Sequence, residues 1–398
     1  MKKVLVLLTA FLALLPGRAQ EIAELKQAFR NLGFEDIRIS LQADTLFVSI
    51  EDHAFRGTFR GAAMGIKEIA EHYPEILNVE MLLTDYKQPQ LIVHASRHYS
   101  LWDVRVDREM KQARFRLKDV EPIAPTTGKI DVTIYPMVSL TNNKLDHLFD
   151  YSVRLAPAVG ITLWQGARVT IQPIFPILHR LDKSDSQRRI QIGTANIQQQ
   201  LFTSKRWKAT AALGFFHPER VGLQTKIELH ACRNLDFAID AGLTGQATNR
   251  KKGFLFSPWK RFNFMAVADY YEPQTKLQLE LAGGRFLFGD YGTRLDVSRH
   301  FGEYTIGLYG ILTGGEHNAG FHFAIPMSGK KQRRSKVVRL RLPEYYALEY
   351  SMTSYFKYWE QRMGEGYKTQ PDQNRSAHYW EPAFIQEYIT RILNGSFE

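Results

Sequence analysis

The sequence predicts a mainly β protein: an antiparallel outer-membrane β-barrel of about twelve strands, with a small N-terminal α+β periplasmic domain and a C-terminal helical tail. Three observations support this class. From Ile130 onward, apolar side chains recur at every second position through a long series of segments. The connections between these segments alternate between short and long. The chain also begins in the manner of an exported protein.

The first residues have the pattern of a secretory signal peptide. Two lysines precede the apolar run VLVLLTAFLALL, and PGRAQ follows it with small residues. We expect cleavage after Ala19 and export of the mature chain. No cysteine stands at the cleavage site, so no lipid attachment is expected there. Cys232 is the sole cysteine, which excludes an intramolecular disulfide framework.

The chain is basic, with a formal net charge of +11. Removal of residues 1–19 takes away three bases and no acid, which leaves +8. This excess fits anionic glycans or lipids as partners, and it equally fits basic loops that face anionic headgroups. Nucleic acid is not expected as a partner of an exported chain. After the leader, no apolar run reaches the roughly 18 residues of a membrane helix.

Residues 20–97 differ from the rest and predict a periplasmic α+β domain. Helical spacing of apolar residues near position 25 is followed by two alternating strands, a helix over Thr58–His72 and a second hairpin. The order αββαββ is typical of a small two-layer domain. The charged residues 98–128 are interpreted as a linker that ends in EPIAPTTG.

Residues 129–328 are predicted to form the barrel. Each strand has one apolar face and one polar or small face, and most are long enough for the roughly 9–11 residues of a membrane-crossing strand. The expected strands are 130–141, 148–164, 167–179, 188–202, 206–216, 220–232, 234–245, 260–271, 275–288, 292–301, 303–313 and 317–327. A soluble sandwich or a lipocalin-like barrel would also alternate, but strand length and export favour the membrane.

The loops indicate how the barrel is oriented. Connections after the even-numbered strands are mostly short, as at Gln165–Gly166 and Gly302–Glu303, whereas loop 246–260 is long. Outer-membrane barrels have short periplasmic turns and longer external loops. We therefore expect the N- and C-termini in the periplasm. Residues 329–398 are interpreted as a basic segment, KKQRRSKVVRLRL, and an amphipathic periplasmic helix over Trp380–Asn394.

The stretch GGRFLFGDYGTRLDVSRHFGEYTIGLYGILTGG contains residue types that occur in active sites. A phosphate-binding loop is excluded because no helix follows the glycines. Ser298 and His300 share one strand face, and outer-membrane phospholipases resemble this arrangement, because they are twelve-stranded barrels with a Ser/His pair on one strand. That face is the polar interior here, so a solvated network is favoured over a nucleophile and base. No carboxylate–His spacing typical of a metal site accompanies His317 or His322.

Three motifs carry a resemblance to a known family. They are GRFLFGDYG from Gly284, VSRHF from Val297 and GFHFAIP from Gly320, and IEDHAFRGTFRGAAMGI at Ile50–Ile66 adds to them. Together these residues resemble the YjbH-type outer-membrane exopolysaccharide biosynthesis proteins. Longer members of that family are roughly twice this size and some are lipoproteins. The chain therefore looks like a short relative with a single barrel.

The resemblance implies a non-catalytic role in making or exporting an extracellular or capsular polysaccharide. It implies polysaccharide, outer-membrane lipid and other envelope secretion components as partners of a monomer, with no cofactor and no metal. Candidate binding residues in the motifs and the barrel interior are Arg285, Asp290, Arg294, Asp296, Arg299 and His300. Two other functions stay open: an outer-membrane hydrolase of lipid or glycan, and a surface scaffold or adhesin with a plugged barrel.

Overall fold

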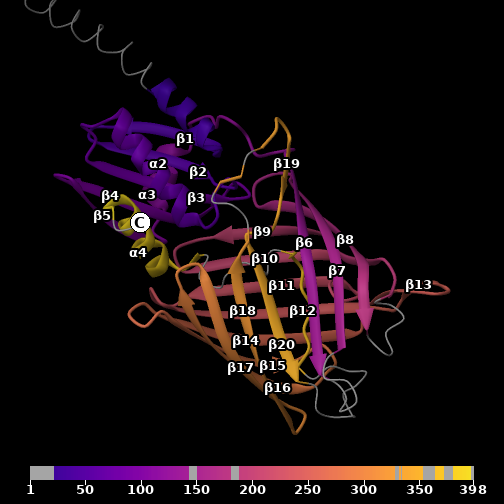
Figure 1. Cartoon of the computed structure of the whole chain (residues 1–398). Coiled ribbons are helices and arrows are strands. Elements are labelled where there is room, and N and C mark those ends of the chain that lie inside the picture. The colour runs from indigo at the N-terminus through magenta and orange to yellow at the C-terminus, as the bar shows by residue number, and fades with distance from the viewer. Residues whose placement is uncertain are drawn as a thin grey trace, which may run out of the picture. The chain divides into compact units, whose positions relative to one another are not determined.

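The computed structural model describes residues 22–142, 150–180, 188–327, 331–332, 334–352, 364–371 and 380–395. The signal peptide expected at residues 1–19 lies outside them. The chain divides into two units. The first contains Met1–Thr126, Lys331–Arg333 and Ile385–Glu398, and the second contains Thr127–Lys330 and Arg334–Phe384. Both are built on β-sheets, so the chain is mainly β, with a small N-terminal α+β part (Figure 1).

The first unit is a five-stranded sheet with helices on both faces. Its strands lie in the order β1-β2-β3-β4-β5 and span Glu35–Gln42, Thr45–Glu51, Asn78–Asp85, Gln88–His98 and Leu101–Asp107. Strands β2 and β3 are parallel because α2 (Thr58–His72) crosses over between them, and the other pairs are antiparallel. The expected αββαββ order and the bounds of α2 agree with this arrangement.

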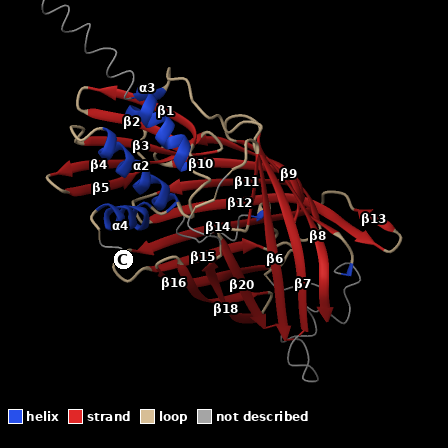
Figure 2. Ribbon diagram, turned by 45° about the horizontal axis from the view of Figure 1, so that its top comes forward, coloured by secondary structure: helices blue, strands red, loops and turns tan. Residues whose placement is uncertain are grey.

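Alternating side chains give this sheet two apolar faces. Ala62, Ile66 and Ile69 of α2 are fully buried, and Met81 of β3 lies against Gly65 of that helix. The opposite face carries Phe47, Leu82 and Ile92, which pack against α3 (Lys111–Leu117). Figure 2 shows the helices of the first unit lying against its strands. Burial of these side chains is the main stabilising contribution in this unit.

The linker expected at residues 98–128 is instead part of the first unit. It contains β5 and α3, and the unit extends to Thr126. The segment LWDVRVD of β5 alternates between exposed and buried residues, with Trp102, Val104 and Val106 inside. Its charged residues lie on the exposed face, and their number makes the segment resemble a connection in the sequence.

The C-terminal helix α4 (Pro382–Leu393) returns to the first unit and covers its edge strand β5. Asn394 Oδ1 accepts from the Trp102 backbone N–H at 2.8 Å, and Asn394 Nδ2 donates to the Trp102 carbonyl at 3.1 Å. Gln386 Oε1 accepts from the Val106 N–H at 3.3 Å. Eight residues of helix rise about 12 Å and four residues of strand about 13 Å, so the two spacings match. The amides thus occupy the edge groups that would otherwise pair with another strand.

The second unit contains a sheet of fifteen strands. Twelve of them are β6 Ile130–Asn142, β7 Asp150–Thr162, β8 Ala167–Arg180, β9 Gln191–Thr203, β10 Trp207–Phe216, β11 Arg220–His230, β12 Leu235–Arg250, β14 Arg261–Glu272, β15 Leu277–Arg285, β16 Tyr291–Phe301, β17 Tyr304–Thr313 and β18 Glu316–Pro326. Each of these twelve corresponds to one expected strand. Successive strands among them pair antiparallel throughout.

Three further strands were not expected. Strand β13 (Gly253–Phe256) forms a hairpin with the end of β12 inside the long loop. Strands β19 (Val338–Arg341) and β20 (Tyr345–Met352) lie in the region interpreted as a basic segment and tail. Both pair with β6 in parallel, and β20 also pairs antiparallel with β18. The basic side chains around β19 hid its short strand pattern. Among the described residues, no helix is long and apolar enough to cross a membrane.

Loss of the Asn394 amide should loosen the edge of the first unit. Asn394→Ala removes two hydrogen bonds to a buried backbone position, each contributing about 1 kcal/mol. The loss of these bonds should make opening of β5 about fivefold or more as frequent. Protease cleavage of an open segment follows the population of the open form, so cleavage should increase by the same factor. Limited trypsin digestion followed by mass spectrometry would measure cleavage after Arg105. The matched control is Gln27→Ala, which loses a single exposed bond to Asn31; equal cleavage in both variants would contradict the edge-capping role.

Candidate functional site

The candidate residues fall in three different places in the second unit. We call one face of the sheet the inner face, and on strand β16 it carries Arg294, Asp296, Ser298 and His300. The outer face carries Leu295 of β16 and Leu308 of the neighbouring strand β17. Ser298 and His300 are buried, whereas the outer leucines are about half exposed or more. Arg285 ends β15 and Asp290 lies in the loop before β16. Arg299 is exposed on the outer face beside Phe301, with its guanidinium 5.1 Å from that ring.

Arg294 organises one cluster on the inner face. Its guanidinium donates two hydrogen bonds to Glu349 of β20, at 3.3 and 2.9 Å, and one to Asp296 at 3.2 Å. The same group stacks on the ring of Tyr309 at 4.1 Å. His322 of β18 completes the cluster, with Nε2 2.9 Å from Asp296 Oδ1. The cluster therefore joins β16 and β20 through paired charges, β18 through the His322–Asp296 contact and β17 through the Tyr309 ring.

Ser298 belongs to this cluster, but its geometry is not that of an activated nucleophile. Its hydroxyl donates to Asp296 Oδ1 at 2.9 Å and lies 3.4 Å from His322 Nε2. A nucleophile–base–acid relay uses the two ring nitrogens of the histidine separately. Here Asp296 and Ser298 face the same nitrogen, so His322 cannot transfer a proton between them. Gly307 permits the arrangement, because a Cβ there would collide with both His322 and Ser298.

His300 is not paired with Ser298. Its Nδ1 lies 2.9 Å from Thr305 Oγ1 and its Nε2 lies 2.9 Å from Gln278 Oε1, so both ring nitrogens are engaged elsewhere. Gln278 in turn donates to both carboxylate oxygens of Asp269. The two side chains share a strand face, as expected, but they enter separate hydrogen-bond networks.

The Gly-Asp motif forms a tight connection between β15 and β16. Asp290 Oδ2 accepts from Thr313 Oγ1 at 2.8 Å and from the Gly364 N–H at 3.1 Å. The Asp290 carbonyl also accepts from the Phe286 N–H. The guanidinium of Arg285 lies 5.9 Å from the ring of Tyr291. These contacts fix the loop and attach it to a distant segment, residues 364–371.

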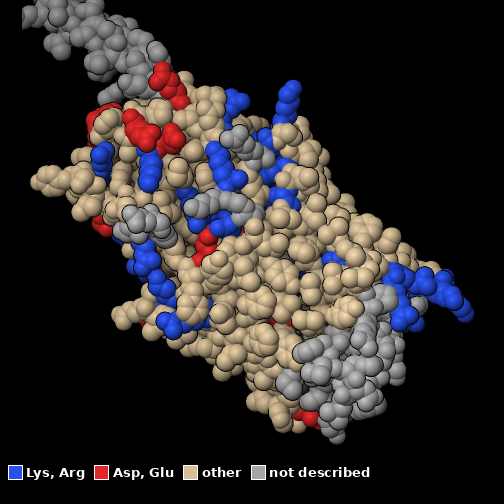
Figure 3. All heavy atoms as spheres, viewed as in Figure 1, with Lys and Arg blue, Asp and Glu red and all other residues tan. Residues whose placement is uncertain are grey.

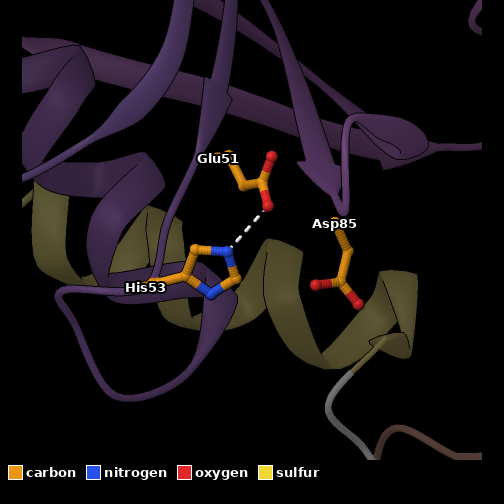
Figure 4. A group of neighbouring side chains, drawn as sticks. All are labelled: Glu51, His53 and Asp85. Carbon is orange, nitrogen blue, oxygen red and sulfur yellow. Dashed lines mark hydrogen bonds and ion pairs between the residues drawn. The ribbon is translucent and has the colours of Figure 1, made fainter. Parts of the chain in front are cut away.

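A further cluster lies in the first unit, at the carboxyl ends of the parallel strands β2 and β3. Glu51, His53 and Asp85 come close enough to one another to suggest a metal site (Figure 4). Glu51 is the last residue of β2 and is fully buried, and its Oε1 lies 2.7 Å from His53 Nε2. This cluster was not predicted from the sequence, although the i, i+2 spacing of Glu51 and His53 in IEDHAF is a usable signal.

The lone pairs of Glu51 are already occupied. Oε1 faces His53 and accepts from the Tyr86 N–H at 3.0 Å, while Oε2 accepts from the Lys87 N–H and from Thr126 Oγ1, each at 3.0 Å. A carboxylate offers about four acceptor positions, so no pair remains for a cation. Burial raises the pKa of Glu51, but the hydrogen bond and charge of His53, with the other donors, outweigh it and lower the pKa overall. Glu51 thus acts as an ionised anchor for the β3–β4 turn.

A second histidine of this unit is held between carboxylates. His94 Nδ1 lies 2.9 Å from Glu80 Oε1, and Nε2 lies 3.5 Å from Asp107 Oδ2. Burial lowers the pKa of His94, but the two carboxylates outweigh it and raise the pKa to about 9. The His94 contact lowers the pKa of Asp107 to about 2 despite partial burial. The three residues sit on neighbouring strands and form a cross-strand ion cluster that bridges β3, β4 and β5.

The two units distribute polarity in opposite ways. In the first unit the buried side chains are mostly apolar. In the second unit many buried side chains are polar and many exposed ones are large and apolar. The buried polar side chains include Thr170, Gln172, Asn196, Thr244, Gln278, Ser298, His300 and Thr305. The exposed apolar side chains include Ile171, Leu213, Ile227, Ile239, Leu281, Leu295, Ile306, Leu308, Leu312 and Phe321. In Figure 3 the visible surface over these strands carries few charges, whereas charges are dense on the first unit.

The inner charges continue along the sheet beyond β16. Glu228 of β11 lies 2.9 Å from Lys226 and 3.7 Å from Lys208. Gln224 donates to Asp240 of β12 at 2.6 Å. These residues were expected on the polar face of their strands. Lys226 and Glu228 lie two residues apart on β11, whereas the contacts of Glu228 with Lys208 and of Gln224 with Asp240 join neighbouring strands and depend on their register.

Comparison with known proteins finds no matching family model, no matching curated protein and no matching solved structure.

Replacement of Glu51 should destabilise the β3–β4 turn. Glu51→Gln replaces one acceptor oxygen by an amide N–H₂ group, which is itself a donor. At least one of the buried donors that now bind Glu51 then has no acceptor, which costs about 1–3 kcal/mol of stability. We expect amide exchange at Tyr86 and Lys87 to accelerate by roughly ten- to a hundredfold. Hydrogen-exchange mass spectrometry would measure it, with Glu71→Gln as the exposed control. If Glu51→Gln instead abolished binding of a divalent cation and left exchange unchanged, a metal-ligand role would replace the anchoring role.

Proposed function

We propose that the second unit is a closed β-barrel in the outer membrane and that the chain serves the secretion of an extracellular polysaccharide without catalysing a reaction. The observation that carries the membrane part is the reversed polarity of the second unit. Exposing many large apolar side chains to water is unfavourable, whereas a lipid bilayer accepts them. The buried polar face then corresponds to the interior of the barrel.

Strand pairing supports closure. The path of neighbouring strands runs from β11 through β6, β20 and β14 to β12, and β11 also pairs with β12 over its whole length. A ring of β6–β12, β14–β18 and β20 contains an odd number of strands, and such a ring requires one parallel pair. The parallel contact of β20 with β6, Ser351 with Thr141 and Met352 with Asn142, supplies it. This pairing of β20 with β6 covers two residues of each strand and is the narrowest joint of the proposed ring. Closure matters because the hydrocarbon offers no partner to an unpaired strand edge.

The strand lengths are compatible with a membrane. The strands of the proposed ring, apart from β20, run from nine residues in β15 to sixteen in β12, and a tilted strand needs roughly 9–11 to cross. The hairpin connections at one end of the sheet are all short, as at Gly302–Glu303 between β16 and β17, whereas the opposite end combines the long β12–β14 connection with short turns such as Gly314–Gly315. We assign that end to the periplasm, together with the first unit.

The polysaccharide part rests on the motif resemblance, and the interior chemistry is compatible with it. Paired charges and amides, as in the Arg294–Glu349–Asp296 cluster, can exchange hydrogen bonds with sugar hydroxyls and water. The hydrolase alternative is disfavoured because Ser298 and Asp296 face the same nitrogen of His322, and His300 is bound to Gln278 and Thr305. Partners in such secretion would be other envelope components.

The membrane assignment predicts a difference between two identical substitutions. Leu308→Arg should reduce the yield of folded protein strongly, because Arg at a lipid-facing position near the midplane costs about 2–4 kcal/mol. Leu77→Arg in the first unit should have little effect, since Leu77 has a similar exposure, 50% against 65%, but faces water. The measurement is the heat-modifiable folded band in the outer-membrane fraction. Equal yields would show that Leu308 does not face lipid.

The polysaccharide assignment predicts a loss of surface product without loss of synthesis. Deleting the gene should lower surface polysaccharide per cell while the intracellular precursor stays level or accumulates. Ser298→Ala should secrete as wild type, because it removes one hydroxyl from a network and not a nucleophile. Barrel abundance measured in parallel serves as the control. A folded Ser298→Ala protein with the deletion phenotype would favour the hydrolase, since loss of a nucleophile costs many orders of magnitude in rate.

A further inference from the structure

A short segment of the second unit contacts two separated groups of strands. Residues 364–371 follow β20 in the chain and belong to the second unit. Their partners are inner-face residues of β8, β9 and β10 at one end and the β15–β16 loop with β17 at the other. In the strand order these two groups lie on opposite arms of the sheet. We call residues 364–371 the strap.

The first end of the strap is attached to the Gly-Asp loop. The Gly364 N–H donates to Asp290 Oδ2 at 3.1 Å, and the Glu365 carbonyl accepts from the Leu287 N–H at 3.0 Å. Gly364 also lies against the side chains of Ile311 and Phe286. One carboxylate oxygen of Asp290, a candidate binding residue, is therefore hydrogen-bonded to the strap.

The second end of the strap pairs with the opposite arm. Lys368 and His217 exchange two backbone hydrogen bonds, of 2.9 and 2.6 Å, and form an antiparallel bridge. The Thr369 carbonyl accepts from Asn196 Nδ2 at 2.6 Å. Gln370 accepts from Thr170 Oγ1 at 3.1 Å and donates to Asn196 Oδ1 at 3.3 Å.

The middle of the strap is packed against the sheet by an aromatic pair. Tyr367 stacks on Phe216 of β10 with the ring centroids 5.2 Å apart. Its hydroxyl occupies the position that a Cβ at Gly242 of β12 would take, so the glycine provides the space. Thr369 and Gln370 are buried. The strap thus makes specific hydrogen bonds and packing contacts with the strands along its length, as expected of a segment that has a defined binding position there.

We propose that the strap is an internal gate that closes the barrel interior and must leave it before a hydrophilic polymer can pass. This inference rests on the proposed function, because it requires a closed barrel. The strap runs from one group of strands to the group on the opposite side of the ring, so it obstructs the path along the barrel interior. Its anchors are a few hydrogen bonds to side chains and to backbone groups just outside the strands, together with the stack of Tyr367 on Phe216, so it can be displaced without unfolding the strands. The groups it would vacate, Asp290, Asn196 and Thr170, are ones that sugar hydroxyls can engage.

Ion conductance through a planar lipid bilayer tests the gate. The wild-type protein should insert and conduct rarely. Tyr367→Ala/Gln370→Ala removes the stack and the side-chain bonds of Gln370, so the open fraction should rise about tenfold or more. The matched control is Tyr99→Ala/Gln27→Ala in the first unit, where Tyr99 is almost fully exposed and Gln27 makes one exposed bond. The control should conduct as wild type.

A disulfide lock shows whether the strap itself is responsible. The His217–Lys368 bridge is a hydrogen-bonded antiparallel pair, in which Cα atoms lie about 5.5 Å apart, within the range that a disulfide spans. His217→Cys/Lys368→Cys would be added to the strap variant, with Cys232, the native exposed thiol, changed to Ser. Oxidation should restore the closed state, and reduction should reopen it on the same molecules.

The possible outcomes separate the gate from the barrel. Conductance that rises in the strap variant and falls on oxidation supports the gate. A wild-type protein that inserts with a constantly open pore, or a strap variant that stays closed while its folded band is normal, overturns the gate and leaves the membrane assignment intact. A wild-type protein that does not insert into bilayers overturns the membrane assignment, and the gate with it. A lock that forms without changing conductance also overturns the gate.

Discussion

Alternation of side chains along an extended backbone is the constraint on which the second unit depends. Because successive residues of a strand point to opposite faces, each long strand can hold one apolar and one polar face. In this chain the buried face is the polar one, with Thr170, Gln278 and His300, and the exposed face carries Leu295 and Leu308. This orientation is unfavourable in water and favourable in lipid, and it is the reason why we propose a membrane environment for the second unit.

Once polar groups are buried, they must find partners. The inner face solves this with cross-strand networks, in which Arg294 joins Glu349 and Asp296, and Gln278 joins Asp269 and His300. Removing one partner of such a network leaves a buried group unpaired, so its members support one another. The strap uses the same chemistry. Its backbone groups pair with the side chains of Asp290 and Asn196 and with the backbone of His217.

The first unit follows the usual rule for a protein in water, with apolar residues inside. Its buried polar residues include Glu51, which acts as an ionised anchor, and the half-buried amides of Gln386 and Asn394 occupy the edge of β5. Both devices connect segments that are far apart in the chain. Glu51 joins the end of β2, the β3–β4 turn and Thr126, and Asn394 brings the C-terminal residues to β5.

Local periodicity determined much of this protein from its sequence. The twelve long strands, the bounds of α2 and the helix α4 all follow from spacing of two or 3.6 residues, which is a property of neighbours in the chain. Alternation also places Leu308 and Asp296 on opposite faces, and in the structure Leu308 is exposed whereas Asp296 is mostly buried. Short or charged elements, β5, α3, β19 and β20, gave patterns too brief to separate from loops.

Only the tertiary structure decided which polar residues meet. Ser298 and His300 are neighbours in the sequence, yet His300 contacts Gln278, and Ser298 contacts Asp296 near His322. The partners on other strands, Gln278 and His322, depend on the register between strands, which turn geometry and the pairing of the whole sheet set together. For the same reason the sequence could not show that residues 364–371 reach Asp290 and Thr170, because each contact joins residues that are distant in the chain and is selected by the whole sheet.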